Sequence, residues 1–172
     1  MASVYEKYYE RQPGAVKVIA VAGIALLGYS LYRTYKRKQD EKDASQAAQN
    51  AASELATLAN QGITPSYTDS QYSSFVNVLV QAMTGCGTDE DQVYDVFRKM
   101  HNDADIRKLI IAFGVQYYEP CVWTSPVSYA IWQANDHAYG GDLATWLGYD
   151  LTTSEIGKIN QILAGSGINY QF

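Results

Sequence analysis

Residues 75–113, FVNVLVQAMTGCGTDEDQVYDVFRKMHNDADIRKLIIAF, contain three successive helical patterns. In each pattern, apolar residues recur at intervals of three and four, the spacing that places side chains on one face of an α-helix. Asn102 or Asp103 is a candidate N-cap for the third helix, and Gly114 suits the left-handed position beyond its last turn. The stretch therefore predicts three short helices, whose apolar residues are Phe75, Val78, Leu79, Ala82 and Met83; Val93, Val96, Phe97 and Met100; and Ile106, Leu109, Ile110 and Phe113.

Two more helices are predicted further along the chain. Thr152 and Glu155 form a capping box at the start of the last one. Gly62 and Pro65 interrupt the pattern that precedes residue 75, so the domain is assigned to residues 62–172. Five short helices with brief connections predict an all-α helical bundle. The apolar residues of the last two helices are Leu143, Trp146 and Leu147, then Ile156, Ile159 and Leu163.

An aromatic insertion, VQYYEPCVWTSPVSYAIWQANDHAYGG, separates the third and fourth helices at residues 115–141. Loops of this length in compact domains are usually functional or hold structure of their own. One interpretation is a partner-binding surface built on Trp123, Tyr129 and Trp132, because Trp and Tyr are enriched at interface hot spots. The alternative is that these rings cover the core of the domain itself.

An apolar segment, GAVKVIAVAGIALLGYSLY, occupies residues 14–32 and contains one charged residue, Lys17. A helix of this length spans about 28 Å, close to the hydrocarbon core of about 30 Å. Tyr29, Tyr32 and Tyr35 lie at its far end, where an aromatic belt contacts the membrane interface. The sequence predicts a transmembrane helix over residues 14–35. A cleaved signal peptide fits less well, because a basic segment follows the long apolar run and no small-residue cleavage site precedes it.

The segments on either side of this span are also assigned. Residues 1–13 are predicted to form an interfacial segment that ends at Pro13, with a flexible tail as the alternative. Residues 36–61 are rich in Ala and Gln without Gly or Pro, which predicts a water-exposed helical stalk. Basic residues after the span outnumber those before it, which favours the cytoplasmic side for the domain.

Charge is divided unevenly along the chain. Residues 1–38 carry a net charge of +5 and residues 62–172 a net charge of −7. Phosphate backbones repel an acidic domain, so the expected partners are a lipid bilayer and other proteins, without nucleic acid. Cys86 and Cys121 are the only cysteines and have no metal-ligand spacing. Two buried thiols are favoured over a disulfide between them.

The string Met83-Thr84-Gly85-Cys86-Gly87-Thr88-Asp89-Glu90 resembles the loop between the first two helices of an annexin repeat, M-x-G-x-G-T-D-E. The resemblance includes the following helices and residues 142–151, DLATWLGYDL, which look like the fourth helix of such a repeat and its closing acidic residue. It excludes the aromatic insertion, and it covers one repeat where annexins carry four. The string and the ending Gly167-Ile168-Asn169-Tyr170-Gln171-Phe172 also resemble small uncharacterised proteins of bacteria and their phages.

The resemblance implies a calcium site. Its ligands would be the main-chain carbonyls of Met83, Gly85 and Gly87 together with the carboxylate of Asp150, since calcium prefers hard oxygen ligands. The same string has a second interpretation that needs no ion. Thr88 would then be a helix N-cap, with Asp91 completing a capping box at the positive end of the helix dipole.

Motifs typical of enzymes are missing from the sequence. His101 and His137 are the only histidines and neither has a metal-ligand spacing, and there is no G-x-S-x-G, P-loop or dinucleotide-binding motif. We therefore expect a non-enzymatic, single-pass structural or interaction protein that docks through its acidic face and aromatic insertion. By resemblance, its setting is a membrane-containing bacteriophage, as a minor component of the virion's internal membrane, or the host cell membrane. The alternatives are a calcium-dependent membrane- or protein-binding module and a phage lysis membrane protein.

Overall fold

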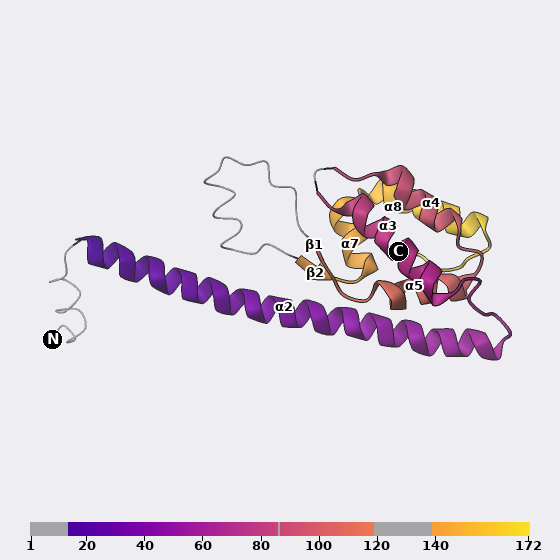
Figure 1. Ribbon diagram of the computed structural model, residues 1–172, viewed down its shortest axis with the longest axis horizontal. Coiled ribbons are helices and arrows are strands. Elements are labelled where there is room, and N and C mark those ends of the chain that lie inside the picture. The colour runs from indigo at the N-terminus through magenta and orange to yellow at the C-terminus, as the bar shows by residue number, and fades with distance from the viewer. Residues whose placement is uncertain (1–13, 86, 119–138) are drawn as a thin grey trace. The chain divides into compact units, whose positions relative to one another are not determined.

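A computed structural model of the chain describes residues 14–85, 87–118 and 139–172, with the main chain alone described for residues 14–30, 33, 118 and 139 (Figure 1). The chain divides into two compact units, Met1–Gln39 and Asp40–Phe172. The helices are α2 (Gly14–Asn60), α3 (Asp69–Met83), α4 (Glu90–Arg98), α5 (Asp103–Phe113), α7 (Leu143–Asp150) and α8 (Thr153–Gly165). Two short strands, β1 (Gln116–Tyr118) and β2 (Tyr139–Gly141), complete the described elements.

The first unit contains the N-terminal part of α2, so residues 14–35 are helical as predicted. Among the residues described, no helix combines the length and the apolar character needed to cross a membrane. The side chains of residues 14–30, which make up most of the predicted span, lie outside the described residues, as does the whole of the predicted interfacial segment 1–13. Leu31, Tyr32 and Tyr35, at the far end of the span, are exposed.

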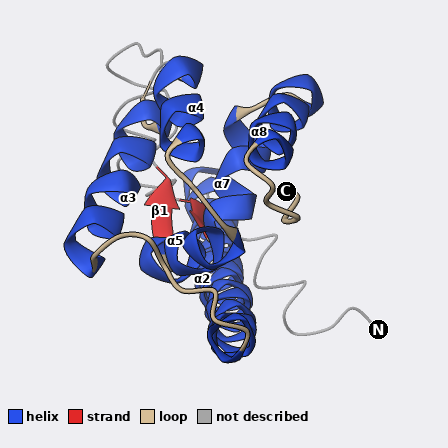
Figure 2. Ribbon diagram, turned by 90° about the vertical axis from the view of Figure 1, so that its right-hand side faces the viewer, coloured by secondary structure: helices blue, strands red, loops and turns tan. Residues whose placement is uncertain are grey.

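The second unit is a helical bundle, and all five predicted helices are present in it. Helix α3 packs against α4 and α5, and α8 packs against α4 and α7 (Figure 2). The apolar faces that the sequence predicted meet in one core, where Phe97, Leu109, Trp146 and Ile159 are almost fully buried. The coarse prediction of an all-α fold is therefore confirmed.

Side-chain caps fix where several of these helices begin. Asn102 is the N-cap of α5, one of the two predicted candidates, and Thr152 forms the predicted capping box with Glu155 at the start of α8. A second capping box, Thr68 with Gln71, starts α3. Each cap satisfies main-chain N–H groups that the helix leaves without acceptors, worth about 1 kcal/mol per cap.

The predicted stalk differs from the structure. The last part of α2, residues 40–60, belongs to the same compact unit as the bundle, so the boundary lies at Gln39 rather than at residue 61. Ala44 and Ala51, seven residues apart on one face of the helix, are 2% and 4% exposed. Glu54 forms an ion pair of 2.5 Å with Arg107 of α5. This half of the helix therefore belongs to the same unit as the head and buries Ala44 and Ala51, while most of its other residues are exposed.

The strands β1 and β2 form an antiparallel pair that the sequence analysis did not predict. Tyr118 pairs with Tyr139, so the aromatic insertion begins and ends at neighbouring positions. Trp146 of α7 donates its indole N–H to the carbonyl of Gln116, which fixes the pair to the bundle. A Cβ atom at Gly141 would lie 2.7 Å from the Cβ of Thr145, so only glycine fits this close approach.

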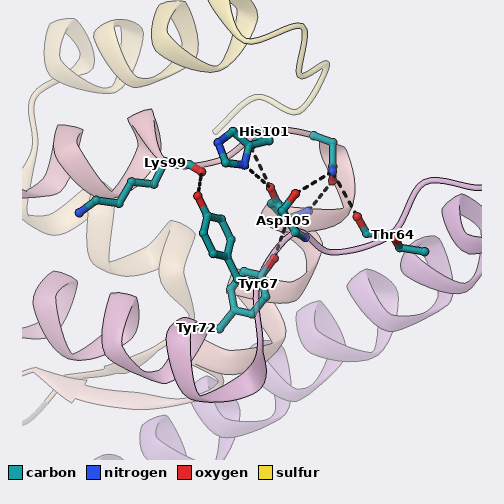
Figure 3. A network of polar contacts seen from close by, with 8 residues as sticks. Thr64, Tyr67, Tyr72, Lys99, His101 and Asp105 are labelled. Atoms are coloured by element: carbon teal, nitrogen blue, oxygen red, sulfur yellow. Dashed lines mark hydrogen bonds and ion pairs between the residues drawn. The ribbon is translucent and has the colours of Figure 1, made fainter.

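One buried carboxylate, Asp105, is the polar centre of the bundle (Figure 3). It accepts hydrogen bonds from the main-chain N–H of Ser66 at 2.6 Å, the hydroxyl of Tyr72 at 2.6 Å and the main-chain N–H of His101 at 2.8 Å. The Tyr67 hydroxyl donates to the carbonyl of Lys99 nearby. The network ties residues 66–72, which include the start of α3, to the start of α5.

Burial and the hydrogen bond to Asp105 raise the pKa of Tyr72 well above its ordinary value. The hydroxyl therefore stays protonated in the folded state over the physiological range and keeps donating to the carboxylate. A carboxylate without donors in this position would cost several kcal/mol of desolvation.

The buried face of α2 leads to a first prediction. Ala51→Arg should lower the free energy of unfolding by about 2 kcal/mol or more, because a long charged side chain must enter the core. Ala52→Arg, one residue further at an exposed position, should change it by less than about 0.5 kcal/mol. Chemical unfolding of the full chain in detergent micelles, followed by tryptophan fluorescence, measures both. Equal effects would mean that this part of α2 does not pack on the bundle.

The second prediction concerns alkaline pH. A tyrosine whose pKa is higher in the folded state contributes stability that is present below its unfolded pKa, about 10, and is lost as the pH rises above that value. Tyr72→Phe should therefore lose less unfolding free energy than the wild type between about pH 9 and pH 11. Tyr149→Phe, at a position 55% exposed, serves as the control and should follow the wild type. Parallel pH profiles for all three proteins would contradict the assignment.

Candidate functional site

The loop between α3 and α4, residues 84–89, is a tight turn that depends on two glycines. Gly85 has φ 100° and Gly87 has φ 90°, values that side chains other than glycine rarely adopt. A Cβ at either position would meet no atom within 4 Å, so the backbone conformation and not lack of space requires glycine. The main-chain N–H of Asp89 donates to the carbonyl of Ala82 at 2.9 Å, which closes the loop.

The helix cap at this loop differs from the predicted one. Asp89, and not Thr88, is the N-cap of α4, and its carboxylate accepts from the main-chain and side-chain N–H groups of Gln92. Both hydrogen bonds lower the pKa of Asp89, and the one from the Gln92 side chain has the larger effect. The predicted box between Thr88 and Asp91 was wrong because two adjacent residues compete for one capping position, and the structure uses the second.

Thr88 makes a contact of a different kind. Its hydroxyl donates to the main-chain carbonyl of Asp150 at 3.4 Å, across 62 residues of sequence. Asp150 is the last residue of α7, is half-buried, and has its Oδ2 atom fully buried. The loop and the predicted acidic ligand are therefore neighbours, even though the aromatic insertion lies between them in sequence.

The strand pair explains how the insertion is accommodated. Because Tyr118 and Tyr139 are paired, the described main chain before residue 119 and after residue 138 lies side by side, so the ends of the strand pair that face α5 and α7 are neighbours. The predicted partner-binding residues Trp123, Tyr129 and Trp132 lie outside the described residues. So do Cys86 and Cys121.

The chemistry of the loop fits a hard cation better than a transition metal. Main-chain carbonyls of Met83, Gly85 and Gly87 and the carboxylate of Asp150 are all oxygen donors, as calcium prefers, and water would supply the rest of its six to eight ligands. No group of three or more His, Cys, Asp or Glu side chains able to hold a metal occurs in the ranges that the structure describes. Any ion here would rest mainly on main-chain oxygens.

A second feature is an acidic hollow of about 610 Å³ where α4 and α8 begin side by side. Its wall carries the carboxylates of Glu90, Asp91 and Glu155 with the ring of Tyr94, whereas Lys158 is its one cation. The Lys158 ammonium lies 4.1 Å from the centre of the Tyr94 ring. Burial of the Tyr94 hydroxyl is the largest cause that raises its pKa, and the three nearby carboxylates raise it further. The remaining lining residues are Ser154 and Gln161.

The sequence predicted an acidic face but not this hollow. Glu90 and Glu155 each lie in the first turn of a helix, where a negative charge interacts favourably with the helix dipole. This local role is enough to explain both residues, so the sequence gives no reason to expect that they share a surface hollow. Their proximity follows from the packing of α4 on α8, which joins residues more than sixty positions apart. The acidic residues in the first turns of these two predicted helices were the only sequence feature that pointed to the hollow.

The buried core of the described residues contains one carboxylate. Asp105 is the one charged residue among the buried residues of the described part of the chain, and three donors already surround its carboxylate. A carboxylate with its hydrogen bonds satisfied in this way supports the structure of the bundle.

Comparison of the chain with protein-family profiles, with curated proteins and with solved structures finds no match.

Proposed function

We propose that the chain is a single-pass membrane protein whose acidic helical head is a non-enzymatic interaction module. The observation that carries this proposal is the continuity of α2, which runs without interruption from Gly14 through the apolar run to Asn60. A helix that is apolar on all sides over residues 14–32 is typical of a bilayer span. The face of α2 that carries Ala44 and Ala51 holds the head to the end of the same helix.

The partners of the head are proposed to be other proteins of an assembly that present basic side chains. The hollow between α4 and α8 supports this, since three carboxylates and an aromatic ring suit ammonium and guanidinium groups. An acidic surface disfavours nucleic acid. The proposed setting is a membrane-containing bacteriophage, in the virion's internal membrane or the host cell membrane. It rests on the resemblance to small bacterial and phage proteins that combine one annexin-like repeat with a Gly-x-x-Tyr-x-Phe ending.

A calcium-dependent module that binds membranes or proteins is the second candidate. The observation that favours it is the hydrogen bond from Thr88 to Asp150, because the annexin-like loop requires a distant carboxylate beside it. Met83, Gly85, Gly87 and Asp150 would hold the ion, which would supply a positive charge for anionic headgroups or carboxylates. In this candidate the positive φ angles of Gly85 and Gly87 shape the cradle, and Asp89 serves only as the helix cap.

The third prediction tests the membrane anchor. The wild-type chain should stay in the membrane pellet after an alkaline carbonate wash. Replacing Leu26 and Leu27 together by Arg should release it, since each arginine costs about 2.5–3.5 kcal/mol at the centre of a span. Ala52→Arg, which adds the same charge in the head portion of α2, should leave the chain in the pellet. Wild-type chain in the supernatant would overturn the proposed anchor.

The fourth prediction tests the calcium candidate. If the loop binds calcium, a concentration one hundred times the dissociation constant should raise the unfolding free energy of the full chain in micelles by about 2.7 kcal/mol. Asp150→Ala should remove this gain, and Asp95→Ala, which removes an exposed carboxylate elsewhere, should keep it. Calorimetric titration and pelleting with anionic vesicles measure the two properties. No change at millimolar calcium would exclude the candidate and leave the loop a helix connection.

A further inference from the structure

The last five residues, 168–172, lie against the bundle as an extended segment that belongs to no helix or strand. Ile168 is buried, Tyr170 and Phe172 are half-buried, and Asn169 and Gln171 are exposed. This alternation with a period of two is the pattern of an extended peptide in a groove, where every second side chain faces the protein.

Side chains from two helices bind the main chain of this segment. Asn160 of α8 accepts from the N–H of Phe172 at 2.9 Å and donates to its carbonyl oxygen at 3.1 Å. Asp103, in the first turn of α5, accepts from the N–H groups of Asn169 at 2.9 Å and Tyr170 at 3.2 Å. An amide that pairs with both main-chain groups of one residue imitates a neighbouring strand. Recognition of this kind places few demands on the sequence of the peptide.

Two rings supply the sequence preference. The guanidinium of Arg107 lies 4.3 Å from the centre of the Tyr170 ring, and Phe172 meets the edge of Phe97 with the ring centres 5.4 Å apart. Tyr170 also lines a hollow of about 310 Å³ with Asp103 and Arg107, so the ring site has room beside it. Aromatic anchors in such positions carry much of the affinity of peptide complexes.

The link to α8 limits how much of the segment can move. The N–H of Ile168 donates to the carbonyl of Leu163 at 3.0 Å, and Gly167 has φ 75°, the left-handed position that ends a helix. Ile168 therefore stays with its own helix. Within the described part of the chain, residues 169–172 are held to the bundle by their hydrogen bonds with Asp103 and Asn160 and by the packing of the Tyr170 and Phe172 rings.

We propose that Phe97, Asp103, Arg107 and Asn160 form a peptide-binding groove, and that residues 169–172 are its exchangeable ligand. The groove fits an x-Tyr-x-Phe segment, because residues 169–172 are the segment it holds. A second copy of the chain carries the same segment, so two heads can be joined when each donates its tail to the other. This inference is independent of the proposed anchor and of calcium.

The direct test uses a chain that ends at Ile168, in detergent micelles, and a fluorescent peptide of residues 166–172. The peptide should bind the shortened chain saturably and bind the intact chain at least tenfold more weakly, because the intact tail competes. Asn160→Ala in the shortened chain should weaken binding at least tenfold, whereas Gln161→Ala, the exposed neighbour, should not. Equal affinity for the shortened and intact chains, or no binding to a folded shortened chain, would overturn the proposal.

Exchange between copies is tested by mixing two labelled chains. One carries Asp103→Ala and Asn160→Ala with its tail intact, and the other ends at Ile168 with its groove intact. Energy transfer should appear on mixing and disappear when the donor chain also carries Tyr170→Ala and Phe172→Ala. Absence of transfer between folded chains would restrict the groove to its own tail and refute the exchange.

Hydrogen exchange on the intact chain decides the matter if the shortened chain does not fold. The amides of Tyr170 and Phe172 should exchange much faster than the core amides of α8, because the tail detaches while the bundle stays folded. If these amides exchange only with global unfolding, the tail is a permanent part of the core and the proposal fails.

Discussion

The arrangement of the head depends on the hydrogen bonds to the buried carboxylate of Asp105. A carboxylate removed from water is costly unless donors replace the lost hydration, and here two main-chain N–H groups and one hydroxyl do so. The donors are Ser66 before α3, Tyr72 in the first turn of α3 and His101 before α5. The carboxylate therefore favours the arrangement in which these elements meet, since separating them would remove its donors. Apolar packing supplies most of the stability, but it is far less specific about position.

This constraint determines the position of the candidate site. Once α3 is held to α5, the end of α3 places the loop that contains Gly85 and Gly87, and Asp89 starts α4 from there. Helix α4 then packs on α8, and Thr88 contacts the end of α7. The candidate calcium loop and the acidic hollow both result from this packing of the helices. The aromatic insertion leaves it intact because the strand pair closes its two ends.

The sequence predicted the helices of the head well because each has a regular apolar period and a recognisable cap, as Asn102 and Thr152 illustrate. It did not predict the packed half of α2, since Ala44 and Ala51 are equally compatible with buried and exposed positions. The strand pair was missed because each strand is only three residues long and the paired residues are more than twenty positions apart in the sequence. In the site, the string Met83–Glu90 indicated the loop, but not the use of Asp89 as the cap or the contact of Thr88 with Asp150. That contact is tertiary and leaves no local pattern.

A double-mutant cycle between Tyr72→Phe and Asp105→Asn tests this account most directly. Unfolding free energies of the wild type, both single variants and the double variant give the coupling energy between the two side chains. The account predicts a coupling of about 1 kcal/mol or more, as expected for groups in one buried hydrogen-bonded network. Additive effects, with a coupling near zero, would contradict it, because the carboxylate would then not be the group that holds α3 to α5.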